Sequence, residues 1–369
     1  MLNFKEVLSR FNEECTGCGL CLQGCPMIPF TDLGAVPPER IMEEIRNLLS
    51  HRKVGYLALS RINTCLYCNN CASSCPQGLN PALAFALGKG VLQELGEPVK
   101  PGASVLTVIE KILQAALPAF REKADGAAWL ITDIQDKPPT PCETLLFPSC
   151  FALIQQEVLL TAVRILQKID PGLRVLGGFD YCCGELQLMA GQPEAAEEQF
   201  VRLIEGLNAF KPKTVVIFCP TCKMNFDKHY PRTDWSWIFI TDFIFDHLAR
   251  LGPLKEVPTE VTIHDPCHFV RGKESGSDSP RKILRAIPGL SILEMKNRGE
   301  GTWCCGAYAI NSPSGKSFRD ARLVEAAKTG ASVLSLYCPG CQMILGPEGP
   351  KYSLQVESVL SLLGQSMGL

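Results

Sequence analysis

Hydrophobic positions in the first hundred residues recur at the spacing of amphipathic helices. Ile41, Ile45 and Leu48 fall on one helical face, and the pair Pro37-Pro38 precedes them where a helix would begin. The pattern predicts helices over residues 4–11, 38–49 and 82–95, the last ending where glycine and proline follow. The N-terminal segment should therefore be mostly helical.

Beyond residue 143 the pattern changes to short apolar or β-branched runs that alternate with amphipathic stretches. Such alternation is typical of α/β units with largely parallel sheets. The apolar run 235–245 fits a buried strand that leads into a core helix. Helices are expected over residues 154–168, 193–209, 279–286 and 318–329.

This second half of the chain also repeats itself, with an offset of about 120 residues. Each copy contains a lone cysteine after an apolar run, then a Cys-Cys-Gly triplet, then a Cys-Pro-x-Cys turn. The cysteines are Cys150, Cys182, Cys183, Cys219 and Cys222 in the first copy, and Cys267, Cys304, Cys305, Cys338 and Cys341 in the second. Because each group follows a predicted strand, the cysteines should gather at the carboxyl ends of the strands.

The fold class expected from these patterns is α/β, with a mostly helical N-terminal domain followed by two tandem repeated α/β domains. The boundaries are residues 1–100 for the helical domain, 101–142 for a connecting helix (103–123) and a proline-rich linker, 143–257 for the first repeat and 258–369 for the second. A chain of 369 residues is long enough for each domain to bury its own core.

Composition excludes several classes of function. Lys and Arg number 36 against 38 Asp and Glu, without a run of like charge, so no nucleic-acid partner is expected. No glycine-rich phosphate-binding motif occurs, so neither a dinucleotide nor a nucleoside triphosphate should bind. The apolar stretches contain charges and are too short to form a transmembrane segment.

The amino terminus lacks the pattern of a secretory signal, so a cytoplasmic location is expected. In that compartment the 19 cysteines should remain reduced rather than form a disulfide framework. Their spacing must then reflect another chemistry.

Eight cysteines of the helical domain form the run C-x2-C-x2-C-x3-C-P twice. In such runs three cysteines hold one cubane [4Fe–4S] cluster, and the fourth, next to proline, serves the other cluster. The expected ligand sets are Cys15, Cys18, Cys21 and Cys75 for one cluster, and Cys65, Cys68, Cys71 and Cys25 for the other. Zinc is the alternative, but structural zinc sites do not need this spacing twice.

Residues 10–95 resemble the helical ferredoxin domains of heterodisulfide reductase small subunits and of the iron–sulfur subunits of glycerol-3-phosphate and glycolate dehydrogenases. The resemblance implies a domain that carries electrons between partners through two cubane clusters.

The paired cysteines of the repeats allow several interpretations: a vicinal disulfide, a zinc site, a redox dithiol, a buried apolar pair or a metal cluster. Recurrence beside Gly184 and Gly306, in the same order, favours a bound cluster. Cys142 is the one cysteine that no set includes, and its role stays open.

Residues 143–345 are similar to two tandem cysteine-rich CCG domains, as in the catalytic subunit of heterodisulfide reductase and its single-chain, membrane-associated form. The resemblance implies two noncubane [4Fe–4S] clusters, with a disulfide reduced between them. Because the chain lacks a nucleotide-binding motif, an electron donor of the flavoprotein or hydrogenase type is expected on another subunit, and a membrane or quinone-linked partner is a further expectation. The rival interpretation is a non-catalytic electron-transfer subunit of a flavin-dependent 2-hydroxy acid or glycerol-3-phosphate dehydrogenase.

Two histidines flank the lone cysteine of the second repeat. His264 and His268 are candidates for donating a proton to a leaving thiolate, because histidine titrates near neutral pH. The alternative is that His264 and Asp265 only cap the turn after a strand. Lys223 and Arg271 either bind an anionic substrate or offset the charge of a thiolate cluster.

Overall fold

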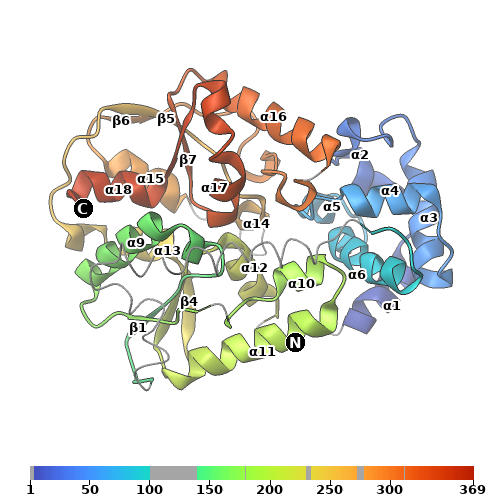
Figure 1. Ribbon diagram of the computed structural model, residues 1–369, viewed down its shortest axis with the longest axis horizontal. Helices are drawn as coiled ribbons and strands as arrows, with labels where there is room; N and C mark the ends of the chain where they lie inside the picture. The colour runs from blue at the N-terminus through green and yellow to red at the C-terminus, as the bar shows by residue number, and fades with distance from the viewer. Residues whose placement is uncertain (1–3, 100–138, 179, 230–233, 272–277, 311) are drawn as a thin grey trace. The chain divides into compact units, whose positions relative to one another are not determined.

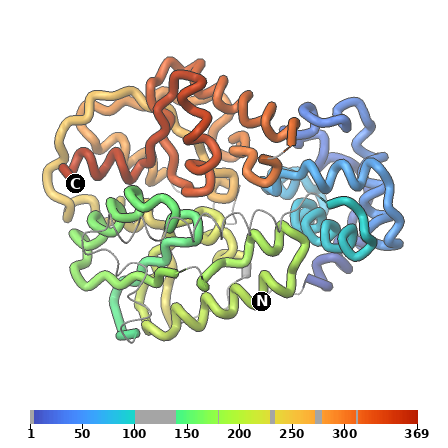
Figure 2. The backbone as a smooth tube through the Cα atoms, in the orientation of Figure 1, coloured from blue at the N-terminus to red at the C-terminus, as the bar shows by residue number. Residues whose placement is uncertain are grey.

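The computed structural model describes residues 4–99, 139–178, 180–229, 234–271, 278–310 and 312–369. The expected connecting helix 103–123 and most of the linker lie outside these ranges. The chain divides into two compact units, each assembled from separate stretches of sequence (Figures 1 and 2). A helical unit contains Met1–Val108, Gly184–Glu197 and Trp303–Arg322, and an α/β unit contains the remainder.

The helical unit packs around α6 (Pro81–Glu94), a helix with almost no polar face. Asn80 caps it by accepting a hydrogen bond from the Leu83 amide at 3.2 Å, and Pro81 starts the first turn. Most side chains of its central turns are buried. The other helices of the N-terminal stretch are α1 Phe4–Glu14, α2 Leu20–Gln23, α3 Pro38–His51, α4 Tyr56–Thr64 and α5 Asn70–Ser73, with a 3-10 turn at Ile28–Phe30.

The stretch after the first cysteine pair packs directly on α6. Helix α10 (Glu185–Met189) contributes to the same core, and the Gln93 amide donates to the Ala190 carbonyl at 3.0 Å. The backbones of Gly90 and Gly191 approach so closely that a Cβ atom on Gly90 would lie 2.5 Å from the Gly191 oxygen. Only glycine fits at such a contact.

The α/β unit contains two four-stranded sheets in which every pair of strands is parallel, as the sequence predicts. The strands are β1 Thr144–Phe147, β2 Arg174–Val175, β3 Thr214–Ile217, β4 Ser236–Phe239, β5 Thr259–Ile263, β6 Leu290–Ile292, β7 Val333–Leu336 and β8 Gln355–Ser358. Their orders are β2-β1-β3-β4 in one sheet and β6-β5-β7-β8 in the other.

Helices of both repeats share one hydrophobic core between the sheets. Helix α9 (Gln156–Ile169) packs on α18 (Val359–Met367), and α13 (Ile240–Asp246) packs on α15 (Ser279–Ala286), so each repeat supplies one partner to each pair (Figure 1). Within the described ranges beyond residue 139, the other helices are α11 Pro193–Ala209, α12 Pro220–His229, α14 Cys267–Val270, α16 Pro313–Ala327 and α17 Pro339–Leu345. Short 3-10 turns occur at Ala152–Ile154, Leu248–Leu251, Gly299–Gly301, Ala307–Ala309 and Gly349–Tyr352.

Most expected elements are present in the structure. Helices α11 and α15 have the bounds that the sequence predicts, and the apolar run 235–245 is β4 followed by α13. Helix α4 and the final pair β8 and α18 were not expected. Over the described ranges, none of the helices combines the length and the apolarity that crossing a bilayer requires.

Candidate metal centres

The thiols of Cys15, Cys18, Cys21 and Cys75 line one cavity of the helical unit. The cavity contains about 330 Å³ of space without protein atoms, part of it open to solvent. Cys18 is exposed, whereas Cys21 is buried on α2. Burial, together with neighbouring thiols that include Cys75, raises the pKa of Cys21 to about 12. The proline-linked Cys75 therefore lies with the other motif's three cysteines.

The second group of thiols contains Cys65, Cys68, Cys71 and Cys25, all of them buried. Arg61, on α4, donates from one Nη to the sulfurs of Cys25 and Cys65, at 3.5 and 3.7 Å. The Tyr67 amide also donates to Cys65, at 3.4 Å. Burial raises the pKa of the Cys65 and Cys71 thiols, because a thiolate without solvent is costly.

The environment of this second group fits an anionic cluster. Arg61 is 2% exposed, and within the described ranges no carboxylate pairs with it; its Nε and other Nη have no hydrogen-bond partner. A buried guanidinium needs a compensating negative charge. Burial lowers the pKa of Arg61, but thiolates at Cys25 and Cys65 raise it above its usual value. In the described part of the chain, no three Cys, His, Asp or Glu side chains form the ligand set of a single metal ion.

The first repeat brings its five cysteines to the carboxyl ends of β1, β2 and β3. Cys150 is hydrogen-bonded to Cys182, which with burial raises its pKa, and Cys222 is hydrogen-bonded to both Cys183 and Cys219. Hydrogen bonds from Cys222 and Cys338 hold the pKa of Cys219 well below its ordinary value. Cys142 lies before β1 and outside this set, and burial raises its pKa to about 11.

In the second repeat, the lone cysteine and the Cys-Pro-Gly-Cys turn belong to the α/β unit. Cys267 begins α14, and the sulfur of Cys338 accepts a hydrogen bond from the Cys341 amide at 3.5 Å. Cys304 and Cys305 instead belong to the segment that packs in the helical unit. There the ring of Tyr308 meets that of Tyr67 edge to face, with centroids 5.5 Å apart.

The glycine of each Cys-Cys-Gly triplet has a conformational role. Gly184 and Gly306 have φ angles of +76° and +83° and precede α10 and a 3-10 turn. A residue with a side chain larger than a hydrogen atom would be strained in this left-handed conformation. The glycine therefore lets the chain turn directly after the cysteine pair.

The two Cys-Pro-x-Cys turns contact the opposite repeat reciprocally. Thr221, within the first turn, is hydrogen-bonded to His268 Nδ1 at 2.9 Å, beside Cys267. Conversely, the Pro339 carbonyl of the second turn accepts a hydrogen bond from Gln155, shortly after Cys150. The interaction of Cys219 with Cys338 also lowers the pKa of Cys219 and raises that of Cys338.

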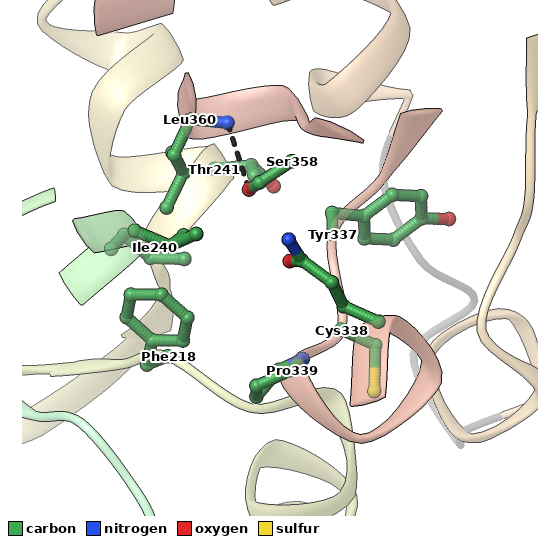
Figure 3. Close-up of a pocket in the computed structure, with 10 residues that line it drawn as sticks. Phe218, Ile240, Thr241, Tyr337, Cys338, Pro339, Ser358 and Leu360 are labelled. Carbon is green, nitrogen blue, oxygen red and sulfur yellow. Dashed lines mark hydrogen bonds between the residues drawn. The ribbon is translucent and has the colours of Figure 1, made fainter. Parts of the chain in front are cut away.

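A small cavity opens beside this contact, between β3 and α13 of the first repeat and β7, α17 and α18 of the second (Figure 3). It is mostly apolar, and the hydroxyl of Ser358, one of its lining residues, accepts a hydrogen bond from the Leu360 amide at 3.1 Å. The described residues that line it are Val158, Phe218, Ile240, Thr241, Tyr337, Cys338, Pro339, Gln342, Ser358 and Leu360, none of them charged.

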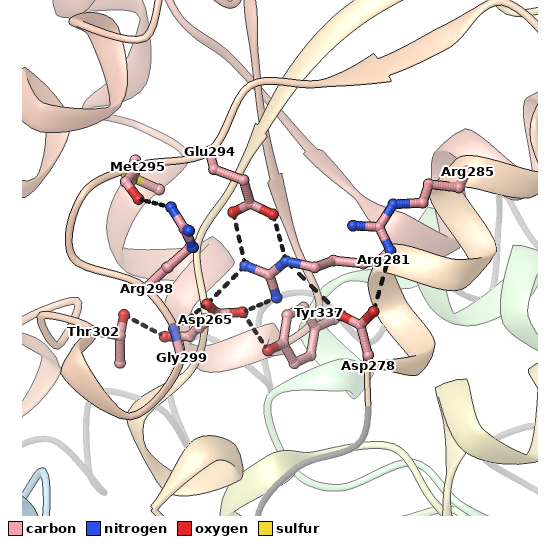
Figure 4. A network of polar contacts seen from close by, with 10 residues as sticks. All are labelled: Asp265, Asp278, Arg281, Arg285, Glu294, Met295, Arg298, Gly299, Thr302 and Tyr337. Carbon is pink, nitrogen blue, oxygen red and sulfur yellow. Dashed lines mark hydrogen bonds and ion pairs between the residues drawn. The ribbon is translucent and has the colours of Figure 1, made fainter.

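A buried polar network holds the strand ends of the second repeat together (Figure 4). Arg281 forms bidentate pairs with Asp265, at 2.8 and 2.9 Å, and with Glu294, at 2.7 and 3.0 Å. Asp265 also accepts from the Tyr337 hydroxyl at 2.8 Å and from the Gly299 amide at 2.7 Å. Asp265 thus ties the loop before Cys267 to the residue before Cys338, a larger role than capping one turn.

The other candidate residues have defined surroundings. His264 is fully buried, and its amide donates to the Ser335 carbonyl at 3.0 Å. Lys223 pairs with Asp227 at 2.7 Å, and Arg271 donates to the backbone of Glu300. Arg61 was not predicted as a site residue, because arginine on a helix normally faces solvent.

Known families match these regions of the chain. Residues 14–80 match the 4Fe-4S dicluster domain, and residues 144–227 and 261–346 each match the cysteine-rich domain called CCG. The first match lies within the N-terminal helical segment, and the other two lie one in each repeat.

Curated relatives match over almost the whole chain. One subunit of the dihydromethanophenazine:CoB–CoM heterodisulfide reductase from Methanosarcina barkeri is 26% identical, over 97% of this chain and 94% of the relative. One subunit of the fumarate reductase (CoM/CoB) from Methanothermobacter marburgensis is also 26% identical, over 95% of this chain and 70% of the relative. The chain is therefore an iron–sulfur electron-transfer protein, built from a 4Fe-4S dicluster domain and two CCG domains, and homologous to this heterodisulfide reductase component.

Proposed function

We propose that this protein takes electrons from a partner flavoprotein or hydrogenase-type subunit, passes them through two cubane clusters, and reduces a disulfide at two noncubane clusters. The cubane ligand sets are Cys15, Cys18, Cys21 and Cys75, and Cys65, Cys68, Cys71 and Cys25. The noncubane sets are the five cysteines of each repeat. When bound, the clusters supply electrons singly, whereas cleavage of a disulfide consumes two.

The reciprocal contact of the two repeats carries this proposal. Hydrogen bonds of Thr221 with His268 and of Gln155 with the Pro339 carbonyl join the two halves that must each receive one sulfur of a cleaved disulfide. The cavity beside Cys338 is lined by uncharged residues, so an uncharged disulfide would meet no charged side chain there. Each product thiolate needs a proton, and His268, held by Thr221 at the junction, is the best-placed donor among the two candidate histidines.

The experiment is anaerobic purification followed by iron and sulfide counts and an assay of disulfide reduction with a reduced viologen dye as donor. About sixteen irons per chain, from four clusters of four, are expected. Cys219→Ser and Cys338→Ser should abolish disulfide reduction, while Cys142→Ser, outside both sets, should leave it at the wild-type rate. Undiminished reduction by both Cys219→Ser and Cys338→Ser would contradict the proposal.

The fumarate reductase relative supports a second candidate function, because its name places it in an enzyme whose electron acceptor is fumarate and not a disulfide. In that case the chain relays electrons for a partner flavin dehydrogenase, and the repeats are relay or structural elements. About eight irons per chain, with no disulfide reduction by the wild type, would favour this candidate.

A further inference from the structure

Two buried cations lie beside the Cys25, Cys65, Cys68 and Cys71 site: Arg61 donates to the sulfurs of Cys25 and Cys65, and Lys89 lies over the ring of Tyr67. Arg61 is 2% exposed and Lys89 is 6% exposed. Neither has a carboxylate partner within the described ranges; the contacts of Lys89 are the Met189 carbonyl at 3.5 Å and the face of Tyr67 at 5.9 Å. Both cations act electrostatically on Cys65.

A buried cation has a predictable effect on a neighbouring redox site. Each one-electron reduction adds a negative charge, which burial disfavours and a nearby positive charge favours. The interaction is stronger away from water, because the effective dielectric constant is lower. Arg61 and Lys89 are fixed by packing, the first against Phe85 at 5.2 Å from the ring centroid, so they need not reorganise when an electron arrives.

The other site of the helical unit is built differently. Cys18 is exposed and Cys15 and Cys75 are partly exposed, so water can solvate added charge there. The cation beside its Cys15 loop, Arg46, is only half-buried, and the field of Arg61 reaches this site at its buried thiol, Cys21. The two sites thus have the same ligands but different main sources of charge compensation.

We infer that Arg61 and Lys89 set the reduction potential of the Cys25, Cys65, Cys68 and Cys71 site, raising it so that this buried site holds an electron without solvent. This inference deepens the proposed function and rests on its cubane assignment. Both residues are positioning residues, and their effect is electrostatic.

The buried site also borders the segment that contains the second cysteine pair. Tyr67, between Cys65 and Cys68, contacts Tyr308, and Phe30 contacts Trp303, which directly precedes Cys304, with centroids 6.3 Å apart. An electron that the two cations stabilise at this site would therefore lie next to the segment that leads to Cys304 and Cys305.

The test is a potentiometric titration of the anaerobic full-length protein, followed by electron paramagnetic resonance, with iron counted in every variant. Arg61→Gln should make the cluster behind one cubane signal at least tenfold harder to reduce, which is a fall in its potential of at least about 59 mV for one electron. Lys89→Met should lower the same signal by less. Arg61→Lys keeps the positive charge, so the potential of that signal should stay close to its wild-type value. Arg46→Gln, the matched control, should leave the potential of that signal unchanged.

Unchanged potentials in both Arg61→Gln and Lys89→Met, with iron retained, would overturn the inference while leaving the electron-transfer function intact. If Arg61→Gln loses the cluster, Lys89→Met decides: a lowered potential supports the inference and an unchanged one overturns it. A wild type without cubane iron would instead overturn the proposed function, and the inference with it.

Discussion

The two cysteine-rich repeats have the same sheet order but hold their cysteines in place by different means. In the first repeat, Phe226 of α12 lies against four aromatic rings: Phe147, Phe200, Trp235 and Trp237, with centroid distances between 5.8 and 6.4 Å. In the second repeat, the Asp265, Arg281, Glu294 and Tyr337 network links the strand ends.

The difference is clearest at equivalent positions. Tyr337 precedes Cys338 and donates to Asp265, whereas Phe218 precedes Cys219 and has no hydroxyl to donate. Pro148 stands where the second repeat has Asp265. Because the cysteines and their order are retained, the site requires the cysteine frame, while either apolar packing or buried ion pairs can support that frame.

Of the substitutions considered, one in the aromatic cluster should lower the free energy of unfolding most. Phe226→Ala removes a fully buried ring at the centre of the cluster and should destabilise the first repeat by about 3–5 kcal/mol. Hydrogen exchange measured by mass spectrometry should show faster exchange in β1 and β3 but not in β5 and β7. Phe226→Leu, which fills most of the volume, is the control and should cost less. Equal effects in both sheets would mean that the repeats are not supported separately.

Loss of the buried Asp265 carboxylate should lower the free energy of unfolding nearly as much. Asp265→Asn keeps the shape but removes the charge that Arg281 pairs with, so it should destabilise the second repeat by about 1.5–3 kcal/mol. The same exchange measurement should then show faster exchange in β5 and β7. The exposed Asp278→Asn is the control, since Asp278 bonds at the rim of the network. No difference between these two variants would contradict a supporting role for the network.

The tyrosine hydroxyl should have a smaller effect. Tyr337→Phe makes the second repeat resemble the first at this position and should cost about 1 kcal/mol, the net contribution of one hydrogen bond. Combined with Asp265→Asn, the substitution should cost less than it does alone, because the two side chains interact directly. Strict additivity in this double-mutant cycle would show that the hydroxyl acts independently of Asp265.

The outermost ion pair should matter least. Arg285 and Asp278 pair at 3.1 Å with about half of each side chain exposed, so Arg285→Ala should change stability by less than about 1 kcal/mol. Urea unfolding at low and at high salt would measure it, and the small effect should vanish at high salt. A loss comparable with that of Asp265→Asn would place the energetic centre of the network at its rim.

Much of the fold was predictable because the signals are local. The helical pattern alone indicated α11 and α15, and the repeat of cysteine motifs indicated two parallel sheets. Helix α4 escaped prediction because Arg61, a charged residue, is one of its buried positions. The strand β8 is too short, and its polar residues too many, to be recognised without its neighbour β7.

The surroundings of the candidate sites were less predictable than their ligands. Cysteine spacing indicates which thiols belong together, but Arg61 lies far from Cys25 in sequence and meets it only through packing. The contact of Tyr67 with Tyr308 joins residues even further apart. Pairings of this kind depend on tertiary structure and leave no local pattern.

The composition of the helical unit has a consequence for how such chains can be divided. Two later segments complete its structure: Gly184–Glu197, directly after the first cysteine pair, and Trp303–Arg322, which contains the second pair. Leu188, Met189 and Ala196 belong to its core. A gene fragment encoding only the N-terminal segment would lack these side chains and expose apolar surface on α6. Exchanging this unit between chains would therefore require three separate stretches of sequence to be transferred together.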